Sequence, residues 1–190
     1  MGCKKSVSLA LTWFFCHESE GMVLEDDCLP NADFYDFWGK MLEHYRDDDR
    51  VWMITGDNFQ KDMGEYPWSY YFSKYNHCWG WASWRRAWRL NDFDYTYLGD
   101  YLRSSALETM SNTPGFSEFW RARFDDVLSG RVDSWAYGWT YSCWLNHGLT
   151  CTPRVNLVSN IGFGDEATHT RGSTSSVASL PTFPLDAPLH

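Results

Sequence analysis

Positively charged residues and long apolar runs are both scarce in this sequence. It holds 16 Lys and Arg against 25 Asp and Glu, and 16 minus 25 gives the formal net charge of −9. Proteins that bind nucleic acid neutralise phosphates with Lys and Arg, so we expect no nucleic-acid partner. The longest apolar stretch near the start, residues 7–15, falls far short of the roughly 20 residues that a membrane helix needs. We therefore expect no transmembrane span and a cytoplasmic protein.

Closely paired cysteines are also missing. The six cysteines include no pair spaced C-x-x-C. His77-Cys78 and Cys143 with His147 come nearest to zinc-ligand spacing, but a structural zinc site needs two close-set ligand pairs of the usual kind. We interpret the cysteines as thiols of the core.

Aromatic residues, in contrast, are abundant. The chain has 12 Trp, 11 Tyr and 12 Phe in 190 residues, a length that suits one domain with a substantial core. From residue 171 the composition shifts to Gly, Ser, Thr and Pro. We expect a domain over residues 1–170 and a tail over residues 171–190 that is disordered or laid loosely on the surface.

The apolar pattern predicts alternating helices and strands. Residues 4–16 have helical spacing, residues 22–24 form a short apolar run that predicts a buried strand, and Pro30-Asn31 begins a clearly amphipathic helix. Val51–Thr55 predicts a second buried strand. Weaker patterns predict strands at 68–72 and 149–152 and helices at 83–89, 97–110, 114–128 and 135–146. This order indicates an α/β fold with flanking helices.

Three consecutive carboxylates, Glu25, Asp26 and Asp27, follow the first predicted strand. Ligands of open α/β sheets bind beyond the carboxyl ends of strands. Mg²⁺ or Mn²⁺ typically takes one or two carboxylates while substrate phosphates and waters complete its shell, so such a site suits a diphosphate. The alternative is a solvated acidic turn that favours the positive end of the next helix.

The segment from Cys78 to Trp84 places tryptophans around Gly80. Aromatic faces stack on bases and on the apolar faces of sugars, and glycine permits close approach of a ligand to the backbone. A large aromatic core is the alternative.

Two later segments also carry candidate residues. One is Asp133–Trp139, and the other is the polar loop 156–164 that continues to His169. A loop of this kind can fold over a metal–diphosphate site. A surface histidine without a ligand is the alternative for His169.

Taken together, these segments resemble one family. The motifs lie at residues 2–8, 24–30, 55–59, 79–81, 134–137 and 156–170. In that order they are similar to bacterial-type nucleotide-diphospho-sugar transferases of the GT-A fold, distantly similar to N-acetylglucosaminyltransferase I. The resemblance covers about residues 1–170 and implies a GT-A-like mixed sheet.

The resemblance implies a role for each motif. Asp27 would bind Mn²⁺ or Mg²⁺, and Glu25 and Asp26 would contact the nucleotide-sugar donor. His169 would be a further contact to metal or phosphate. The residues that would line the sugar and acceptor pocket are Trp79, Gly80, Trp81 and Trp135.

The sequence departs from the family in two places. Only one helix precedes the acidic motif, where GT-A enzymes have βαβ units that hold the nucleoside. We therefore expect the later portion of a transferase domain, lacking much of the N-terminal nucleotide-binding half. Many relatives carry Asp where this chain has Ala136, which cannot accept a proton. Asp133 is the nearest candidate base, and capping of the following helix is its alternative role.

The sequence therefore predicts a metal-dependent glycosyltransferase that moves a sugar from a nucleotide-diphosphate sugar to a glycan or other hydroxyl acceptor, in an active or an inactive form. A carbohydrate-binding module without catalysis is one alternative, because stacked tryptophans and a lost base would suit it. A glycoside hydrolase is the other.

Overall fold

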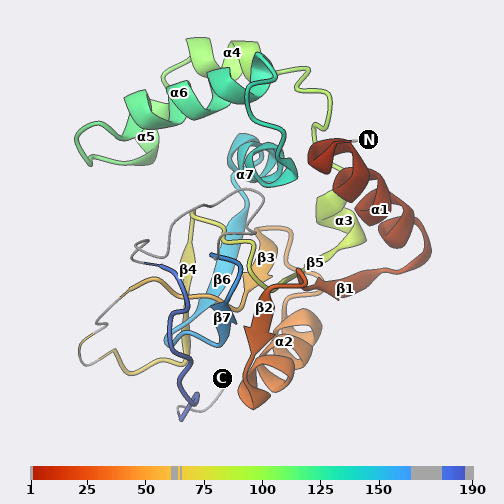
Figure 1. Cartoon of the computed structure of the whole chain (residues 1–190), viewed down its shortest axis with the longest axis vertical. Helices are drawn as coiled ribbons and strands as arrows, with labels where there is room; N and C mark the ends of the chain where they lie inside the picture. The colour runs from red at the N-terminus through yellow and green to blue at the C-terminus, as the bar shows by residue number, and fades with distance from the viewer. Residues whose placement is uncertain (1, 61–63, 65, 164–176, 187–190) are drawn as a thin grey trace.

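The protein is a mixed α/β domain in a computed structural model that describes residues 2–60, 64, 66–163 and 177–186 (Figure 1). Its helices are α1 Cys3–His17, α2 Ala32–His44, α3 Arg85–Trp88, α4 Leu98–Arg103, α5 Ala106–Met110, α6 Phe116–Leu128 and α7 Trp135–Leu145. Its strands are β1 Glu20–Val23, β2 Cys28–Pro30, β3 Val51–Thr55, β4 Tyr70–Ser73, β5 Trp81–Trp84, β6 Leu149–Pro153 and β7 Val158–Asn160.

The larger sheet is mixed, with five strands in the order β1-β5-β3-β6-β4. β3 and β6 pair in parallel, and the other three pairings are antiparallel. Since β1 and β3 both run antiparallel to β5, they run parallel to each other. A second ladder joins β2 to β7. The α/β class with a mixed sheet and flanking helices, predicted from the sequence, is therefore confirmed.

Helices cover both faces of the sheet because its central strands are apolar on both sides. All five residues of β3 and all four of β5 are buried. On one face α2 packs through Phe34, Phe37 and Trp38. The other face carries α1, α3 and α7, and α7 lies between the sheet and the group α4 to α6 (Figure 1).

The second face holds an aromatic cluster in which tryptophans contact one another. Six of the twelve tryptophans of the chain belong to it: Trp52, Trp81, Trp88, Trp135, Trp139 and Trp144. The ring of Trp81 stacks on that of Trp135 with centroids 5.4 Å apart and planes 23° apart. The ring centroid of Trp139 lies 5.0 Å from that of Trp88 and 5.8 Å from that of Trp52. Much of the aromatic content therefore forms the core.

Several predicted elements are confirmed. β3 has the predicted bounds, and α1, α2, α7 and β6 lie within about two residues of the predicted ones. Asn31 caps α2 by accepting a hydrogen bond from the Phe34 N–H, as its position before the helix indicates.

Other predictions need correction. The strand expected at residues 22–24 is β1, which lies at the sheet edge rather than buried, and Met22 is 44% exposed and Leu24 39% exposed. The helix expected at 83–89 begins only at Arg85, because residues 81–84 form β5. The helix expected at 97–110 is two helices separated at Ser104-Ser105. Strands β2 and β7 were not predicted.

Residues 177–186 of the expected tail lie beside β7. The Ser179 N–H donates to the Asn160 carbonyl at 3.0 Å, and the Phe183 N–H donates to the Asn156 carbonyl at 2.9 Å. The Asn31 side chain in turn donates to the Phe183 carbonyl at 2.9 Å. Among the described residues, no helix combines the length and apolar content that a membrane span requires.

The aromatic cluster makes a stability prediction. Trp81 has no exposed surface, so Trp81→Ala removes a buried ring from the centre of the cluster and should lower the free energy of unfolding by about 3–5 kcal/mol. Urea denaturation measures this loss. Trp13 is 66% exposed on α1, so the control Trp13→Ala should stay within about 0.5 kcal/mol of the parent. Equal losses for the two variants would contradict the cluster's role.

Candidate functional site

Carboxylates that are far apart in the sequence come together at one end of the larger sheet. β1 and β3 finish at this end, since both pair antiparallel with β5. Glu25 and Asp27 follow β1, and Asp57 follows β3. We call this the acidic edge, made of Glu25, Asp27 and Asp57. It lies at carboxyl ends of parallel-running strands, where ligands of α/β sheets commonly bind.

Glu25 is bonded to the first turn of α7. The indole N–H of Trp135 donates to Glu25 Oε1 at 3.3 Å. Because the Trp135 ring also stacks on the buried Trp81, the core fixes the position of that N–H. The structure thus brings together Glu25 and Trp135, which the sequence analysis selected separately.

Asp27 lies against the turn that follows β7. The Ile161 N–H donates to the Asp27 carbonyl at 2.9 Å, next to the ladder that pairs Cys28 with Asn160. A Cβ atom at Gly162 would overlap the Asp27 carboxylate. Glycine is therefore the residue that lets the backbone approach this carboxylate closely. Asp26, between Glu25 and Asp27, is exposed.

Asp57 is the buried member of the acidic edge, and the sequence analysis did not select it as a site residue. Its carboxylate accepts hydrogen bonds from the Thr55 hydroxyl and from the Trp79 N–H, the latter at 3.3 Å. Burial raises the pKa of Asp57 from 3.8 to about 7, although these hydrogen bonds oppose the rise. Its position directly after a buried strand is the same signal that selected Glu25 and Asp27.

The Trp79–Trp81 segment contains one partly exposed residue, Trp79, and two buried ones, Gly80 and Trp81. Trp79 is half-buried between Phe59 and Phe163, at centroid distances of 5.2 and 5.5 Å. Gly80 is buried with φ +75, and a Cβ there would crowd Phe34. Trp81, with no exposed surface, offers no face to a ligand; it supports Trp135 instead.

The side chain of Asp133 bonds the start of α1 rather than the start of α7, the helix that follows it in the chain. Its two carboxylate oxygens accept hydrogen bonds from the N–H groups of Cys3, at 2.7 Å, and Lys4, at 3.1 Å. Ser134 caps α7 by accepting from the Ala136 N–H. The expected capping of the following helix by Asp133 is therefore wrong. Both oxygens of the expected base are engaged by backbone donors.

A metal at this edge would draw few ligands from the protein. Among the described residues there is no group of three or more His, Cys, Asp or Glu side chains arranged to hold a metal ion. His169, expected as a further contact, lies outside the described residues. A cation at Asp27 would share that carboxylate with the Gly162 backbone, which lies against Oδ2, and with the Cys28 thiol, which donates to Oδ1 at 3.5 Å. Such a site relies on substrate phosphates and waters.

A comparison of the chain with protein-family models and with curated proteins gives no match.

The buried Asp57 makes a prediction about pH. Because its pKa is raised in the folded protein, the protonated form stabilises the fold; this contribution is complete below about pH 4 and is lost as the pH rises through about 7. Asp57→Asn has no proton to lose. We compare the free energy of unfolding of the parent with that of Asp57→Asn. From pH 4 to pH 8 the parent should lose a few kcal/mol relative to the variant, on the order of 1.4 kcal/mol per pKa unit.

Urea denaturation of both proteins at a series of pH values measures this difference. Groups that titrate in both proteins cancel in the comparison. Parallel pH profiles for the two proteins would show that Asp57 does not titrate in this range.

The position of Asp133 makes a prediction about stability. Asp133→Ala leaves two N–H groups of α1 without their acceptor and should lower the free energy of unfolding by about 1 kcal/mol. Asp133→Asn, which keeps one acceptor oxygen, should lower it less. The exposed Asp47→Ala is the control in the same urea denaturation. A stability equal to the parent in Asp133→Ala would contradict the capping role.

Proposed function

We propose that this protein is a GT-A-type glycosyltransferase that moves a sugar from a nucleotide-diphosphate sugar to a hydroxyl acceptor with the help of Mn²⁺ or Mg²⁺. The observation that carries the proposal is the placement of the acidic motif after a strand, where the buried Trp135 donates its N–H to Glu25 and the Gly162 backbone lies against Asp27. The order of motifs along the chain gives it further support.

Each residue of the acidic edge has a chemical role in this proposal. Asp27 would hold the cation, which supplies Lewis-acid assistance to the departing nucleoside diphosphate when it is bound. Glu25, oriented by Trp135, would accept hydrogen bonds from donor hydroxyl groups. Trp79 would offer its ring to the apolar face of a sugar. Asp57 would position Trp79 through its backbone N–H.

One observation favours a second candidate function, a carbohydrate-binding module. Inverting transfer needs a carboxylate that takes the proton of the acceptor hydroxyl. Ala136 has no such group, and the Asp133 oxygens accept from the backbone of α1. A protein that binds a glycan without transferring it would need no base.

We do not propose glycoside hydrolysis. That reaction uses two carboxyl groups about 5 to 10 Å apart, both in contact with the substrate. Asp57 has no exposed surface, so it cannot pair with Glu25 across a bound sugar.

Thermal unfolding with a metal and a donor tests the transferase. Mn²⁺ together with uridine-diphosphate glucose or uridine-diphosphate N-acetylglucosamine should raise the Tm, by roughly 2–4 °C for each kcal/mol of binding free energy that acts on the fold. Asp27→Asn should abolish the rise. Asp36→Asn, an exposed carboxylate on α2, is the matched control and should keep it.

Two results would decide against the transferase. The first is that no donor raises the Tm in the presence of Mn²⁺ or Mg²⁺ while free oligosaccharides bind without metal. This result would favour the carbohydrate-binding module. A rise that persists in Asp27→Asn would remove Asp27 from the proposed metal site.

A further inference from the structure

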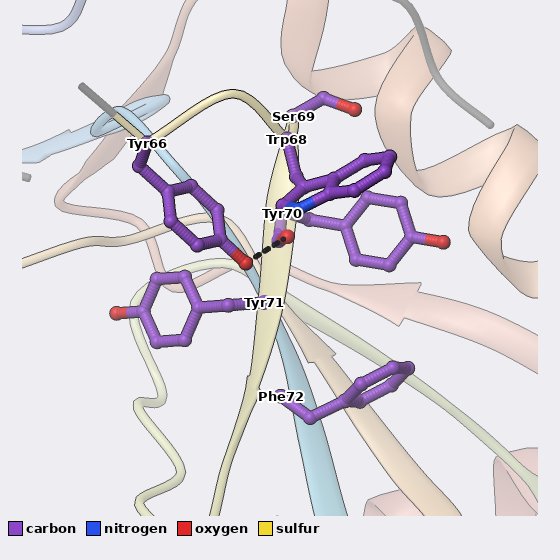
Figure 2. A pocket seen from close by; sticks show the side chains of 6 residues that line it. All are labelled: Tyr66, Trp68, Ser69, Tyr70, Tyr71 and Phe72. Carbon is purple, nitrogen blue, oxygen red and sulfur yellow. Dashed lines mark hydrogen bonds between the residues drawn. The ribbon is translucent and has the colours of Figure 1, made fainter.

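A hollow of about 280 Å³ lies at β4, outside the acidic edge. Figure 2 shows Tyr66 and Tyr71 on one side of the strand and Trp68, Tyr70 and Phe72 on the other. The lining residues are Tyr66, Trp68, Ser69, Tyr70, Tyr71 and Phe72. Because β4 is the last strand in the order of its sheet, a hollow lined from both of its sides lies across the outer edge of the strand.

The lining has the chemistry of a neutral sugar site. None of the six residues is charged, although the chain carries a net charge of −9. Trp68 is 57% exposed and Phe72 is 43% exposed. Aromatic faces pack on the C–H face of a pyranose. The three tyrosine hydroxyls of the lining already bond the protein, at the Tyr70 carbonyl, the Tyr45 hydroxyl and Asn58 Oδ1, so they offer a sugar their remaining lone pairs as acceptors. The volume lies just below the roughly 300–1,000 Å³ of drug-sized sites, so it suits a small ligand unit.

The hollow is next to the acidic edge. β4 runs antiparallel to β6, which runs parallel to β3. β4 therefore begins at the end of the sheet where β3 finishes. The Tyr71 hydroxyl donates to Asn58 Oδ1 at 3.5 Å, and Asn58 directly follows Asp57. Asn58 is buried and fixed by donating to the Pro153 carbonyl at 2.8 Å. A ligand in the hollow would therefore lie beside the strand end that carries Asp57.

We propose that this hollow binds one neutral sugar unit of the acceptor glycan, with Trp68 as its main stacking surface. The proposal rests on the function proposed above, which it extends by assigning the acceptor side of the site. A second unit of the same glycan would point toward the acidic edge, where the donor would be held.

An added peptide strand fits the hollow less well. Strand addition needs the backbone groups of the edge strand. At the start of β4 the Tyr66 hydroxyl donates to the Tyr70 carbonyl at 3.1 Å (Figure 2), so a side chain already occupies that acceptor. Bulky rings on both sides of the strand also favour a compact ring-shaped ligand.

Isothermal titration of the full chain with trisaccharides tests the proposal. The probes are maltotriose, cellotriose, mannotriose and triacetylchitotriose. We expect at least one to bind, and Trp68→Ala should weaken it about tenfold or more, the change that a loss of 1.4 kcal/mol gives. Trp68→Phe, which keeps a ring, should recover most of the affinity. Trp13 on α1 is even more exposed than Trp68, at 66%, so the control Trp13→Ala should bind like the parent.

Three results would overturn the proposal. The first is that none of the four trisaccharides binds at millimolar concentration. The second is that a folded Trp68→Ala binds them as the parent does. The third is that the parent binds extended peptides but no sugars, and that Trp68→Ala abolishes this peptide binding. Urea denaturation of each variant establishes that it is folded.

Sugar binding at the hollow and donor binding at the acidic edge can be tested independently. Trp68→Ala should keep the rise in Tm that Mn²⁺ and a nucleotide sugar produce, because Trp68 lies outside the acidic edge. If trisaccharide binding depends on Trp68 but Mn²⁺ and a nucleotide sugar do not raise the Tm, the sugar site at the hollow stands and the transferase is rejected. If the Tm rises but no trisaccharide binds, the sugar site at the hollow is rejected and the transferase stands.

Discussion

The stack of Trp81 on Trp135 joins the sheet to α7, and the arrangement of the acidic edge depends on it. Trp81 belongs to β5, the strand that sets β1 and β3 parallel to each other. Trp135 begins α7 and carries the N–H that holds Glu25. A buried aromatic pair is rigid because close packing leaves its rings few alternative positions. The core thereby transmits its rigidity to a carboxylate that faces solvent.

Local pattern explains which elements the sequence predicts well. β3 is a continuous apolar run and α2 repeats its apolar residues with helical spacing, so neighbours along the chain determine both. β2 and β7 are three-residue strands that exist only because they pair with each other across more than 120 residues. The contact of Gly162 with Asp27 follows from that ladder. No local signal in either segment reveals it.

Among the site residues, too, local pattern predicts some positions and contacts across the fold determine the others. Glu25 and Asp27 are recognisable from their place after a strand, and by that rule Asp57 was equally recognisable. Trp81 and Trp135 share a residue type with the exposed Trp68, so composition cannot separate core rings from exposed ones. Burial, which depends on the whole fold, makes that distinction. Asp133 meets α1 only in the folded chain, because about 130 residues separate them.

The ladder between β2 and β7 also constrains when this site can form. Contacts between distant segments must overcome the entropy of closing a long loop, so they form late in folding. As the chain leaves the ribosome from its N-terminus, the acidic motif emerges long before Trp135 and Gly162, its two partners. An unfinished chain therefore holds the carboxylates without the residues that orient them. The acidic edge is assembled only when β7 and Gly162 have been synthesised.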